Sequence, residues 1–357
     1  MDFQKLVDIY EELEQTPSGN KMREILSIFF KNVEVEDIAV ISYLTLGQIA
    51  SDYEDINLGI AEKSVLKAIA TAGATDLTRV TKIMQEVGDV GLTAEKVLQK
   101  KPTTLVPLGK LTLKELFEKL HKISESSGSG SQDQKTNLLA SLLQKASQKG
   151  AMYITRIVLG TLRMGVGDMT VLDSLAIAFS GEKKNKEFLE QAYNICPDLG
   201  IIAETMAKEG LKGIQKIDVH IGRPIKMMLA QRVKAIEEIK EKIPGEVTVE
   251  GKYDGERVQA HKNNKGKITL FSRRLENITA QFPDIVKALE KQVNADEFVM
   301  EGEVIAIDEK ENPLSFQTLM QRRRKYDVAE YVEKIPVQLK LFDLLYLNEK
   351  SLLHTSY

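Results

Sequence analysis

The sequence has 357 residues, a hydrophobic share of 43% and a charged share of 28%, which are values of an ordinary soluble protein rather than a disordered or membrane-spanning one. This length favours two domains over one, and the net charge of -3 excludes a uniformly basic nucleic-acid-binding surface but leaves room for a local one. The single cysteine excludes an intrachain disulfide and a cysteine-built zinc site.

The first residues predict a pair of helices rather than a targeting sequence. Apolar residues recur at helical spacing from Phe3 to Leu13, and residues 16–19, which include a proline and a glycine, break the pattern. The same region carries acidic residues instead of the basic and then apolar run of a secretory signal. We therefore expect a cytoplasmic protein without membrane contact, with an inert core thiol at Cys196.

Amphipathic segments continue for roughly two hundred residues and predict an all-helical domain over residues 1–215. Thr112 followed by Glu115 is a capping-box arrangement ahead of an apolar stripe, so a helix should begin there. Residues 124–131 are mostly serine and glycine and should form a mobile loop inside this domain. Apolar stripes at 138–143 and 154–162 mark two more helices, the second one after Gly150.

The pattern changes after Gly213, where a Gly-Arg-Pro sequence at 222–224 interrupts the helical spacing and short alternating runs begin. We place a linker at residues 216–225 and a mixed α and β domain at 226–357. Residues 263–266 should form a hairpin turn, and Pro283 should begin a helix. Strands are expected at Val247 and Val249, at Val258 and Ala260, at Ile268 and Leu270, at 298–307, and at 337–347 ahead of a turn at 348–350.

Residues 250–257 place a lysine, acidic residues and an arginine beside two glycines, an arrangement that can hold a lysine against a phosphate. A lysine amine is a poor nucleophile while protonated, and neighbouring cations or desolvation expose its lone pair. Arg257, Arg273 and Arg274 could supply these cations and also bind phosphate oxygens. In the alternative interpretation, Lys252 and Arg257 are solvated and pair with neighbouring acids on a surface hairpin. The segment alone leaves both interpretations open.

Residues 252–257 are similar to the K-x-D-G-x-R signature of covalent nucleotidyltransferases, which include ligases and capping enzymes. Residues 156–176 resemble the helix and glycine-rich turn of the DNA-binding domain of DNA ligases, a domain that capping enzymes lack. The chain therefore resembles the N-terminal part of an ATP-dependent DNA ligase of the archaeal and eukaryotic type. Further segments resemble later ligase motifs in the order of the family, at 271–277, 301–304, 316–326 and 341–346.

The resemblance implies a multidomain protein. An all-α DNA-binding domain at 1–215 would precede a truncated α+β nucleotidyltransferase (ATP-grasp-like ligase) domain at 226–357. Two further motifs of the catalytic domain and the C-terminal OB-fold of the family have no counterpart before Tyr357. We therefore expect a fragment with impaired activity, and we expect poor solubility or loose packing near residues 341–357, where an incomplete sheet would expose apolar edges.

The resemblance also implies an activity for the complete protein. It would seal nicks in duplex DNA through a lysyl-AMP intermediate and a 5′-adenylated DNA intermediate, with ATP and Mg²⁺ as cofactors. Replication, repair, recombination and the cell cycle are the processes that it would serve. Lys252 would take AMP from ATP, and Asp254 and Gly255 would be further positions of its motif. Glu250 would hold adenine and Phe342 would stack on it. Arg257 and Arg273 would contact the nucleotide, and Glu303 would bind ribose or the metal.

Residues expected to contact DNA lie in both halves of the chain. Arg163, Gly165 and Gly167 form a turn whose exposed amides could approach a phosphate, although a purely structural turn is the minimum interpretation. The basic run of Arg322, Arg323 and Arg324 could bind the DNA backbone or form a solvated helix face. Residues 99–101 lie where the family can carry a sliding-clamp peptide, but the expected aromatic pair is replaced by residues 102–105.

Three alternatives stay open at this point. An RNA ligase or a guanylyltransferase shares the lysine motif. A non-catalytic DNA-binding fragment would retain only the function of the helical half. A helical scaffold protein would neither transfer nucleotides nor bind DNA. In the functional interpretation, Glu303 is a site carboxylate and Phe342 a site aromatic. In the structural interpretation, Glu303 is an edge-strand acid that faces water and Phe342 is part of the core.

Overall fold

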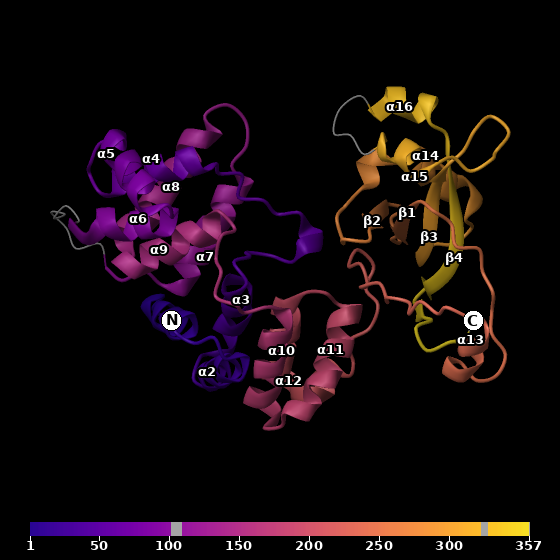
Figure 1. Cartoon of the computed structure of the whole chain (residues 1–357), viewed down its shortest axis with the longest axis horizontal. Helices are drawn as coiled ribbons and strands as arrows, with labels where there is room; N and C mark the ends of the chain where they lie inside the picture. The colour runs from indigo at the N-terminus through magenta and orange to yellow at the C-terminus, as the bar shows by residue number, and fades with distance from the viewer. Residues whose placement is uncertain (101–108, 323–327, 357) are drawn as a thin grey trace. The chain divides into compact units, whose positions relative to one another are not determined.

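A computed structural model describes residues 1–100, 109–322 and 328–356, with only the backbone of Lys100 described (Figure 1). The chain divides into two compact units. The first unit comprises Met1–Tyr193 and Asp198–Ile217, and the second comprises Asn194–Pro197 and Asp218–Tyr357. No helix within the described residues is long and apolar enough to cross a membrane.

The first unit is helical throughout its described residues, apart from an isolated bridge between Asp2 and Thr112. The all-α expectation for this part is therefore confirmed (Figure 1). Its helices are α1 (Gln4–Glu14), α2 (Gly19–Lys31), α3 (Val35–Thr45), α4 (Glu62–Ala72), α5 (Leu77–Val87), α6 (Val90–Val97), α7 (Leu113–Glu125), α8 (Ser131–Lys145), α9 (Gln148–Val158), α10 (Asp168–Ser180), α11 (Lys186–Ile195) and α12 (Leu199–Ile214), with short 3-10 turns η1 (Asp52–Glu54), η2 (Leu98–Lys100) and η3 (Lys183–Asn185).

Capping residues mark several helix starts in this unit. Thr112 caps α7 by accepting a hydrogen bond from the Glu115 amide at 3.1 Å, as predicted. The reciprocal half of the capping box is absent from the described structure, because the Glu115 carboxylate pairs with Lys119 at 3.2 Å and with Lys145. The helix predicted after Gly150 begins earlier, since Ser147 caps α9 and accepts from the Gly150 amide at 3.0 Å.

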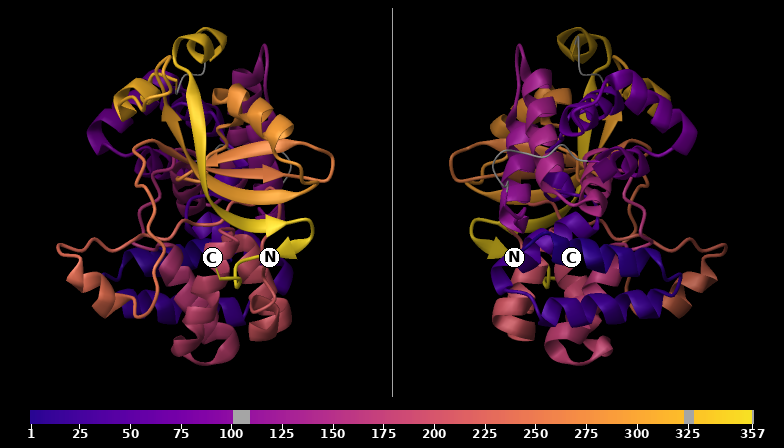
Figure 2. Two further views of the ribbon diagram at one scale, coloured as in Figure 1. Left: turned by 90° about the vertical axis from the view of Figure 1, so that its right-hand side faces the viewer. Right: turned by 90° about the vertical axis from the view of Figure 1, so that its left-hand side faces the viewer.

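The second unit is built on a five-stranded antiparallel sheet with the strand order β2-β1-β3-β4-β5. Strand β4 is long and strongly curved (Figure 2, left). The predicted hairpin turn and the predicted helix at Pro283 are both present. The strands are β1 (Glu256–Lys262), β2 (Ile268–Ser272), β3 (Phe298–Ala306), β4 (Val337–Leu347) and β5 (Lys350–Ser351), and the helices are α13 (Glu237–Lys242), α14 (Pro283–Gln292), α15 (Phe316–Met320) and α16 (Val328–Lys334), with the 3-10 turn η4 (Thr279–Gln281).

The two faces of this sheet have different characters because side chains alternate along each strand. Val258 and Ala260 on β1 join a buried apolar cluster with Ile285 and Leu289 of α14. The intervening positions of β1 are polar and face the other way. There, Arg257 lies opposite Glu303, and Gln259 lies opposite Glu301 on β3. The sheet therefore has an apolar face covered by helix and a polar face that carries the acidic residues.

The strand predicted at Val247 and Val249 is wrong. The structure assigns no strand to residues 243–255, and these two side chains are 44% and 88% exposed. Alternating β-branched residues favour an extended backbone, but a strand also requires a neighbour for its amide and carbonyl groups. The described residues supply no such neighbour.

Candidate active site

The lysine motif leads directly into the polar face of the sheet. Residues 252–255 precede β1, which begins at Glu256. The Lys252 side chain is exposed, and its Nζ donates to the backbone carbonyl of Tyr253 at 3.3 Å. Its positive charge also acts on the carboxylate of Glu303. The motif lysine and the acidic strand β3 are thus neighbours in the fold.

Gly255 explains why the motif approaches β3 so closely. Its amide donates to Glu303 Oε1 at 3.2 Å. A Cβ at this position would run into the carbonyl oxygen of Val304 and would lie 3.0 Å from Cγ of Glu303. Glycine is therefore required here because a side chain would prevent the close approach of the motif to β3, and not because of an unusual backbone angle. The hydrogen bond that this approach allows fixes the position of the Glu303 carboxylate.

Glu303 is half-buried between these groups. Desolvation raises the pKa of its carboxyl, while the hydrogen bond from Gly255 and the charges of Lys252 and Arg257 act in the opposite direction. A carboxylate in this setting gains from an additional cation. Glu303 can therefore serve as a hard oxygen ligand or accept a hydrogen bond from a sugar hydroxyl.

Arg257 is held between an acid and an aromatic ring. Its Nη2 forms an ion pair with Glu301, and its guanidinium carbon lies 5.2 Å from the centroid of the Phe342 ring. Its Nε is buried and has no hydrogen-bond acceptor within the described structure. An orphaned donor of this kind fits a site that takes an anionic group, because a buried N–H without an acceptor is otherwise costly.

Phe342 reaches this place through an irregularity in β4. Gly302 pairs with Leu341 and Glu301 pairs with Asp343, so that Phe342 is the extra residue of a register shift. Its ring is partly buried against Arg257. The prediction that Phe342 belongs to the site agrees with this position, but its stacking on adenine stays a prediction.

Other predicted site residues make no side-chain bond to the residues of this cluster within the described structure. Glu250, Asp254 and Arg273 are exposed, and within residues 1–322 they form no ion pair or side-chain hydrogen bond with Lys252, Arg257 or Glu303. Arg273 and Arg274 lie on the tight turn after β2, in which Leu275 adopts a left-handed conformation with φ of 65°. The structure therefore brings together Lys252, Gly255, Arg257, Glu303 and Phe342, and it leaves the other roles untested.

Three buried polar residues of the same face were assigned no role from the sequence, although Glu301 lies in the segment 301–304 that resembles a ligase motif. Gln259 and His261 are each 1% exposed and Glu301 is 4% exposed. Desolvation lowers the pKa of His261 to about 3, with a smaller contribution from the charge of His220. The signal available in the sequence was the alternation of these polar residues with Val258 and Ala260 on a strand with one buried face.

Comparisons with known proteins match both units. The family "DNA ligase N terminus" matches residues 2–176, and the family "ATP dependent DNA ligase domain" matches residues 227–357. DNA ligase 1 of Methanosarcina acetivorans is 43% identical over 362 residues, covering 99% of this chain. DNA ligase 2 of Thermofilum pendens is 43% identical over 361 residues, covering 99% of this chain. The chain belongs to the ATP-dependent DNA ligase family.

The chain spans 61% of the Methanosarcina ligase and 60% of the Thermofilum ligase. Among solved structures, mycobacterial DNA ligase D complexed with ATP and MES is 30% identical, covers 30% of this chain and 31% of its own chain, and has a TM-score of 0.24. In this chain, the lysine motif, Glu303 and Phe342 all lie inside the residues matched by the second family.

Arg322 does not fit its expected role in DNA contact. It is 1% exposed, and its guanidinium binds Asp284 at 2.7 and 2.9 Å and the carbonyl of Ile335 at 3.0 Å. Its guanidinium carbon also lies 5.4 Å from the ring centroid of Phe282. Arg322 is thus a core residue that joins three segments. Arg323 and Arg324 lie outside the described residues.

The glycine-rich turn between α9 and α10 is exposed in the helical unit. Arg163 and Gly167 are exposed, and Gly165 has a φ of +71°, a conformation that favours glycine. Gly167 precedes α10 and caps it without a side chain. DNA contact at this turn stays a prediction. The clamp segment is only partly described, because Gln99 is exposed in η2 whereas residues 101–105 lie outside the described residues.

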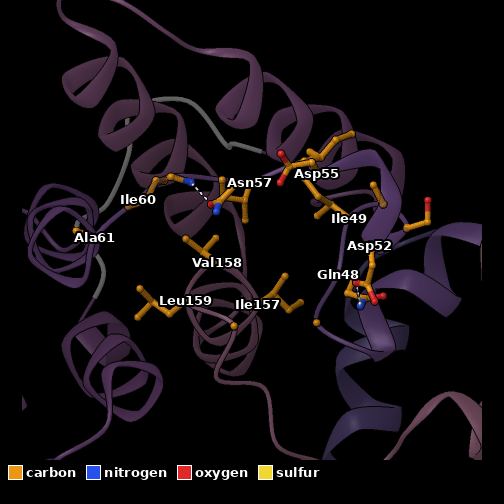
Figure 3. A pocket seen from close by; sticks show the side chains of 17 residues that line it. Gln48, Ile49, Asp52, Asp55, Asn57, Ile60, Ala61, Ile157, Val158 and Leu159 are labelled. Carbon is orange, nitrogen blue, oxygen red and sulfur yellow. Dashed lines mark hydrogen bonds between the residues drawn. The ribbon is translucent and has the colours of Figure 1, made fainter. Parts of the chain in front are cut away.

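A pocket of about 660 Å³ adjoins the start of this turn. Its walls come from residues 47–52 and 55–61 and from residues 157–160 at and just after the end of α9 (Figure 3). The side chains of Ile157 and Val158 point toward the loop that carries Asp52 and Asp55 (Figure 3). None of the residues predicted for catalysis lines this pocket.

The described residues contain no group of three or more His, Cys, Asp or Glu side chains that could hold a metal ion. Mg²⁺ is commonly held by one or two carboxylates together with substrate phosphates rather than by a cage of protein ligands. A single carboxylate such as that of Glu303 is compatible with that mode of binding.

Proposed function

We propose that the protein containing this chain is an ATP-dependent DNA ligase that seals nicks in duplex DNA. The observation that carries this proposal is the convergence of Lys252, Arg257 and Glu303 at one edge of β1 and β3. An amine nucleophile, a guanidinium and a half-buried carboxylate at one place are groups that nucleotidyl transfer to a lysine can use. The family match supports ATP as the nucleotide.

The first step would be attack by the uncharged Lys252 amine on the α-phosphorus of ATP. A nitrogen–phosphorus bond forms, the bond to the pyrophosphate oxygen breaks with its electron pair, and the attacking nitrogen releases one proton to solvent and keeps the other as the N–H of the phosphoramidate. Arg257 would stabilise the developing negative charge, because its guanidinium already lies beside the lysine motif with a free Nε–H. Bound Mg²⁺ would offset charge on the pyrophosphate, with Glu303 as an oxygen ligand.

The next two steps would involve the DNA. The 5′ phosphate at the nick attacks the phosphorus of the lysyl-AMP and displaces the Lys252 amine, which gives 5′-adenylated DNA. The 3′ hydroxyl then attacks that 5′ phosphate, so that a phosphodiester bond forms and AMP leaves. Lys252 thereby returns to its starting state, and the net cost is one ATP converted to AMP and pyrophosphate.

We assign the helical residues 1–215 as the DNA-binding domain, 216–225 as the linker and 226–357 as the N-terminal part of the adenylation domain. Arg163, Gly165 and Gly167 would contact phosphates of the DNA through a cationic side chain and exposed amides. Glu250 would bind adenine, Phe342 would stack on it, and Arg273 would bind the nucleotide. The protein would work in the cytoplasm on nicks left by replication, repair and recombination.

The proposal is tested by covalent labelling of the full-length protein. Incubation with Mg²⁺ and ATP labelled in its α-phosphate should give a covalent protein–AMP adduct that survives denaturation and alkali but is hydrolysed by acid, as expected of a phosphoramidate. Lys252→Ala should abolish the label, because no other amine occupies the motif position. Lys265→Ala is the matched control, since this exposed lysine lies on the β1–β2 hairpin of the same sheet and should retain full labelling.

Undiminished label in Lys252→Ala would contradict the assignment of the nucleophile. Label from GTP rather than ATP would move the protein to the guanylyltransferases, and sealing of nicked RNA instead of DNA would make it an RNA ligase. Binding to nicked duplex without any label would leave a DNA-binding protein without catalysis.

A further inference from the structure

A row of buried polar side chains runs along the polar face of β1. Arg257, Gln259 and His261 occupy alternate positions, and Glu301 lies directly opposite Gln259 on β3. Gln259, His261 and Glu301 are buried, and in a protein interior an unsatisfied polar group costs about 1–3 kcal/mol. Each of these three residues therefore needs hydrogen-bond partners. Their partners form a chain of contacts that runs from residues 222–225 to Arg257.

The row begins at residues 222–225. The amide of Gly222 donates to Nδ1 of His261 at 3.0 Å. Because Nδ1 accepts, the proton of the neutral imidazole must lie on Nε2, which is 2.8 Å from Oε1 of Gln259. The amide of Ile225 donates to the same Oε1 at 2.7 Å. Two donors at this oxygen fix the orientation of the Gln259 amide group.

The row ends at the guanidinium of Arg257. The amide nitrogen of Gln259 donates to Glu301 Oε1 at 2.8 Å and to the carbonyl of Ile225 at 3.3 Å. Glu301 Oε2 accepts from Arg257 Nη2. Glu301 is buried, so its charge requires these two partners, and the same two partners prevent it from turning away.

We propose that His261, Gln259 and Glu301 form a positioning relay through which residues 222–225 hold the guanidinium of Arg257 in place for the nucleotide. The relay rests on the proposed function, since Arg257 is the group that would touch the phosphate. Its members do not contact the reacting atoms. They act by orienting Arg257, in the way that buried partners orient a ligand-binding side chain.

The alternative to this relay is a network that only stabilises the sheet. The two roles differ in how substitutions combine. If Glu301 and Gln259 act through Arg257, removing Arg257 should make further changes in the relay almost silent in the adenylation rate. If they only stabilise the sheet, their effects on the rate should remain in the absence of Arg257.

The experiment measures single-turnover adenylation of the full-length protein with saturating ATP. Gln259→Met preserves the length of the side chain without its hydrogen bonds, and Glu301→Gln preserves shape without charge. Each should slow adenylation about 10- to 100-fold. In an Arg257→Ala background, each should add less than about 3-fold. Val258→Ala, on the apolar face of the same strand, is the control that lowers stability and should leave the rate within about 2-fold.

A second measurement is independent of activity. In the 357-residue chain with ¹⁵N-labelled histidine, the nuclear magnetic resonance shifts of His261 should show the Nε2–H tautomer at neutral pH.

The outcomes separate the relay from the proposed function. If Gln259→Met fails to fold, Glu301→Gln still tests the relay. If the wild type takes no label, the proposed function fails. If the wild type is labelled but Glu301→Gln is equally fast, or if His261 carries its proton on Nδ1, only the relay fails.

Discussion

Glu301 and Glu303 lie two positions apart on one face of β3, but they are in different environments. Glu301 is buried, and its carboxylate accepts hydrogen bonds from Arg257 and Gln259. Glu303 is half-buried and accepts a hydrogen bond from the Gly255 amide. Burial raises the pKa of Glu303 against the smaller influence of its cationic neighbours. Glu301 is therefore suited to hold a side chain in place, and Glu303 is suited to bind a further ligand.

The pH dependence of stability should report on His261. Its pKa falls to about 3 in the folded chain, below the ordinary value near 6.5, because burial disfavours the imidazolium and Nδ1 is needed as an acceptor. The unfolded chain therefore takes up the proton first as the pH falls. The stabilisation is complete above about pH 6.5 and is lost toward pH 3, by about 1.4 kcal/mol for each pH unit.

Calorimetry between pH 7.5 and pH 5 measures this loss in the unfolding of the second unit. In His261→Gln, the free energy of unfolding should fall by about 1 kcal/mol or more less than in the wild type over this pH range. His354→Gln is the matched control, because His354 is exposed in the same unit and should leave the slope unchanged. Equal slopes in His261→Gln and the wild type would show that His261 does not carry the effect.

Several site residues could be found in the sequence because their meaning is local. Lys252, Gly255 and Arg257 follow one another in a short motif, and Glu303 lies in a recognisable acidic strand. Gln259 could not be assigned, because its role depends on Ile225 and Glu301, which are 34 and 42 positions away. The polarity of Gln259 alone does not indicate which residues form its hydrogen bonds in the buried site.

The failure at Arg322 has the same physical origin. A run of basic residues usually lies in water, so its sequence favours the surface. Here the guanidinium is satisfied by Asp284, which lies 38 positions earlier, and by the carbonyls of Gln281 and Ile335. Partners so far away in the chain cannot be read from a local charge pattern.

At the scale of elements, periodicity predicted the helices well because each amphipathic helix buries its own stripe. Strands were predicted where a neighbour was also available, as at the β1–β2 hairpin. The strand at Val247 and Val249 failed because the pairing partner, and not the propensity of the residues, decides whether a strand forms. Leu341 and Leu344 on β4 are 49% and 36% exposed, and the poor solubility expected from such edges stays a prediction.

Arg322 joins α14, the end of α15 and the segment before β4, so its removal should loosen these elements together. We expect Arg322→Met to lower the free energy of unfolding of the second unit by about 2–3 kcal/mol, because Asp284 and two carbonyls lose their partner. Affinity for nicked duplex should be unchanged. Denaturant unfolding and fluorescence anisotropy with labelled DNA measure the two quantities.

Arg274→Met is the matched control for this change, since Arg274 is an exposed arginine of the same unit. Its stability should remain within about 0.5 kcal/mol of the wild type. Weaker DNA binding by Arg322→Met together with normal stability would return Arg322 to the DNA-binding surface.

For the whole molecule, the division into a helical unit and a sheet unit gives a prediction about cooperativity. The two units should unfold in separate calorimetric transitions. Nicked duplex at 100 times its dissociation constant should stabilise the helical unit by about 2.7 kcal/mol and should leave the other transition in place. Arg322→Met identifies the transition of the second unit, because it lowers only that one.

Arg163→Ala should reduce this stabilisation by DNA, because it removes a cation from the turn before α10. Lys114→Ala is the control, since Lys114 is an exposed cation on α7 of the same unit. A single transition, or a shift produced by DNA in the sheet unit alone, would contradict the assignment of the helical unit to DNA binding.

The irregularity at Phe342 affects how sequences of this family should be compared. Because Leu341 and Asp343 pair with consecutive residues of β3, the ladder would close without Phe342 and every later side chain would keep its side of the sheet. A relative with one residue fewer at this point would thus retain the strand and lose only the ring above Arg257. A one-residue gap in an alignment there would mean a missing aromatic platform, whereas the same gap within a regularly paired stretch of β4 would reverse the facing of all that follows.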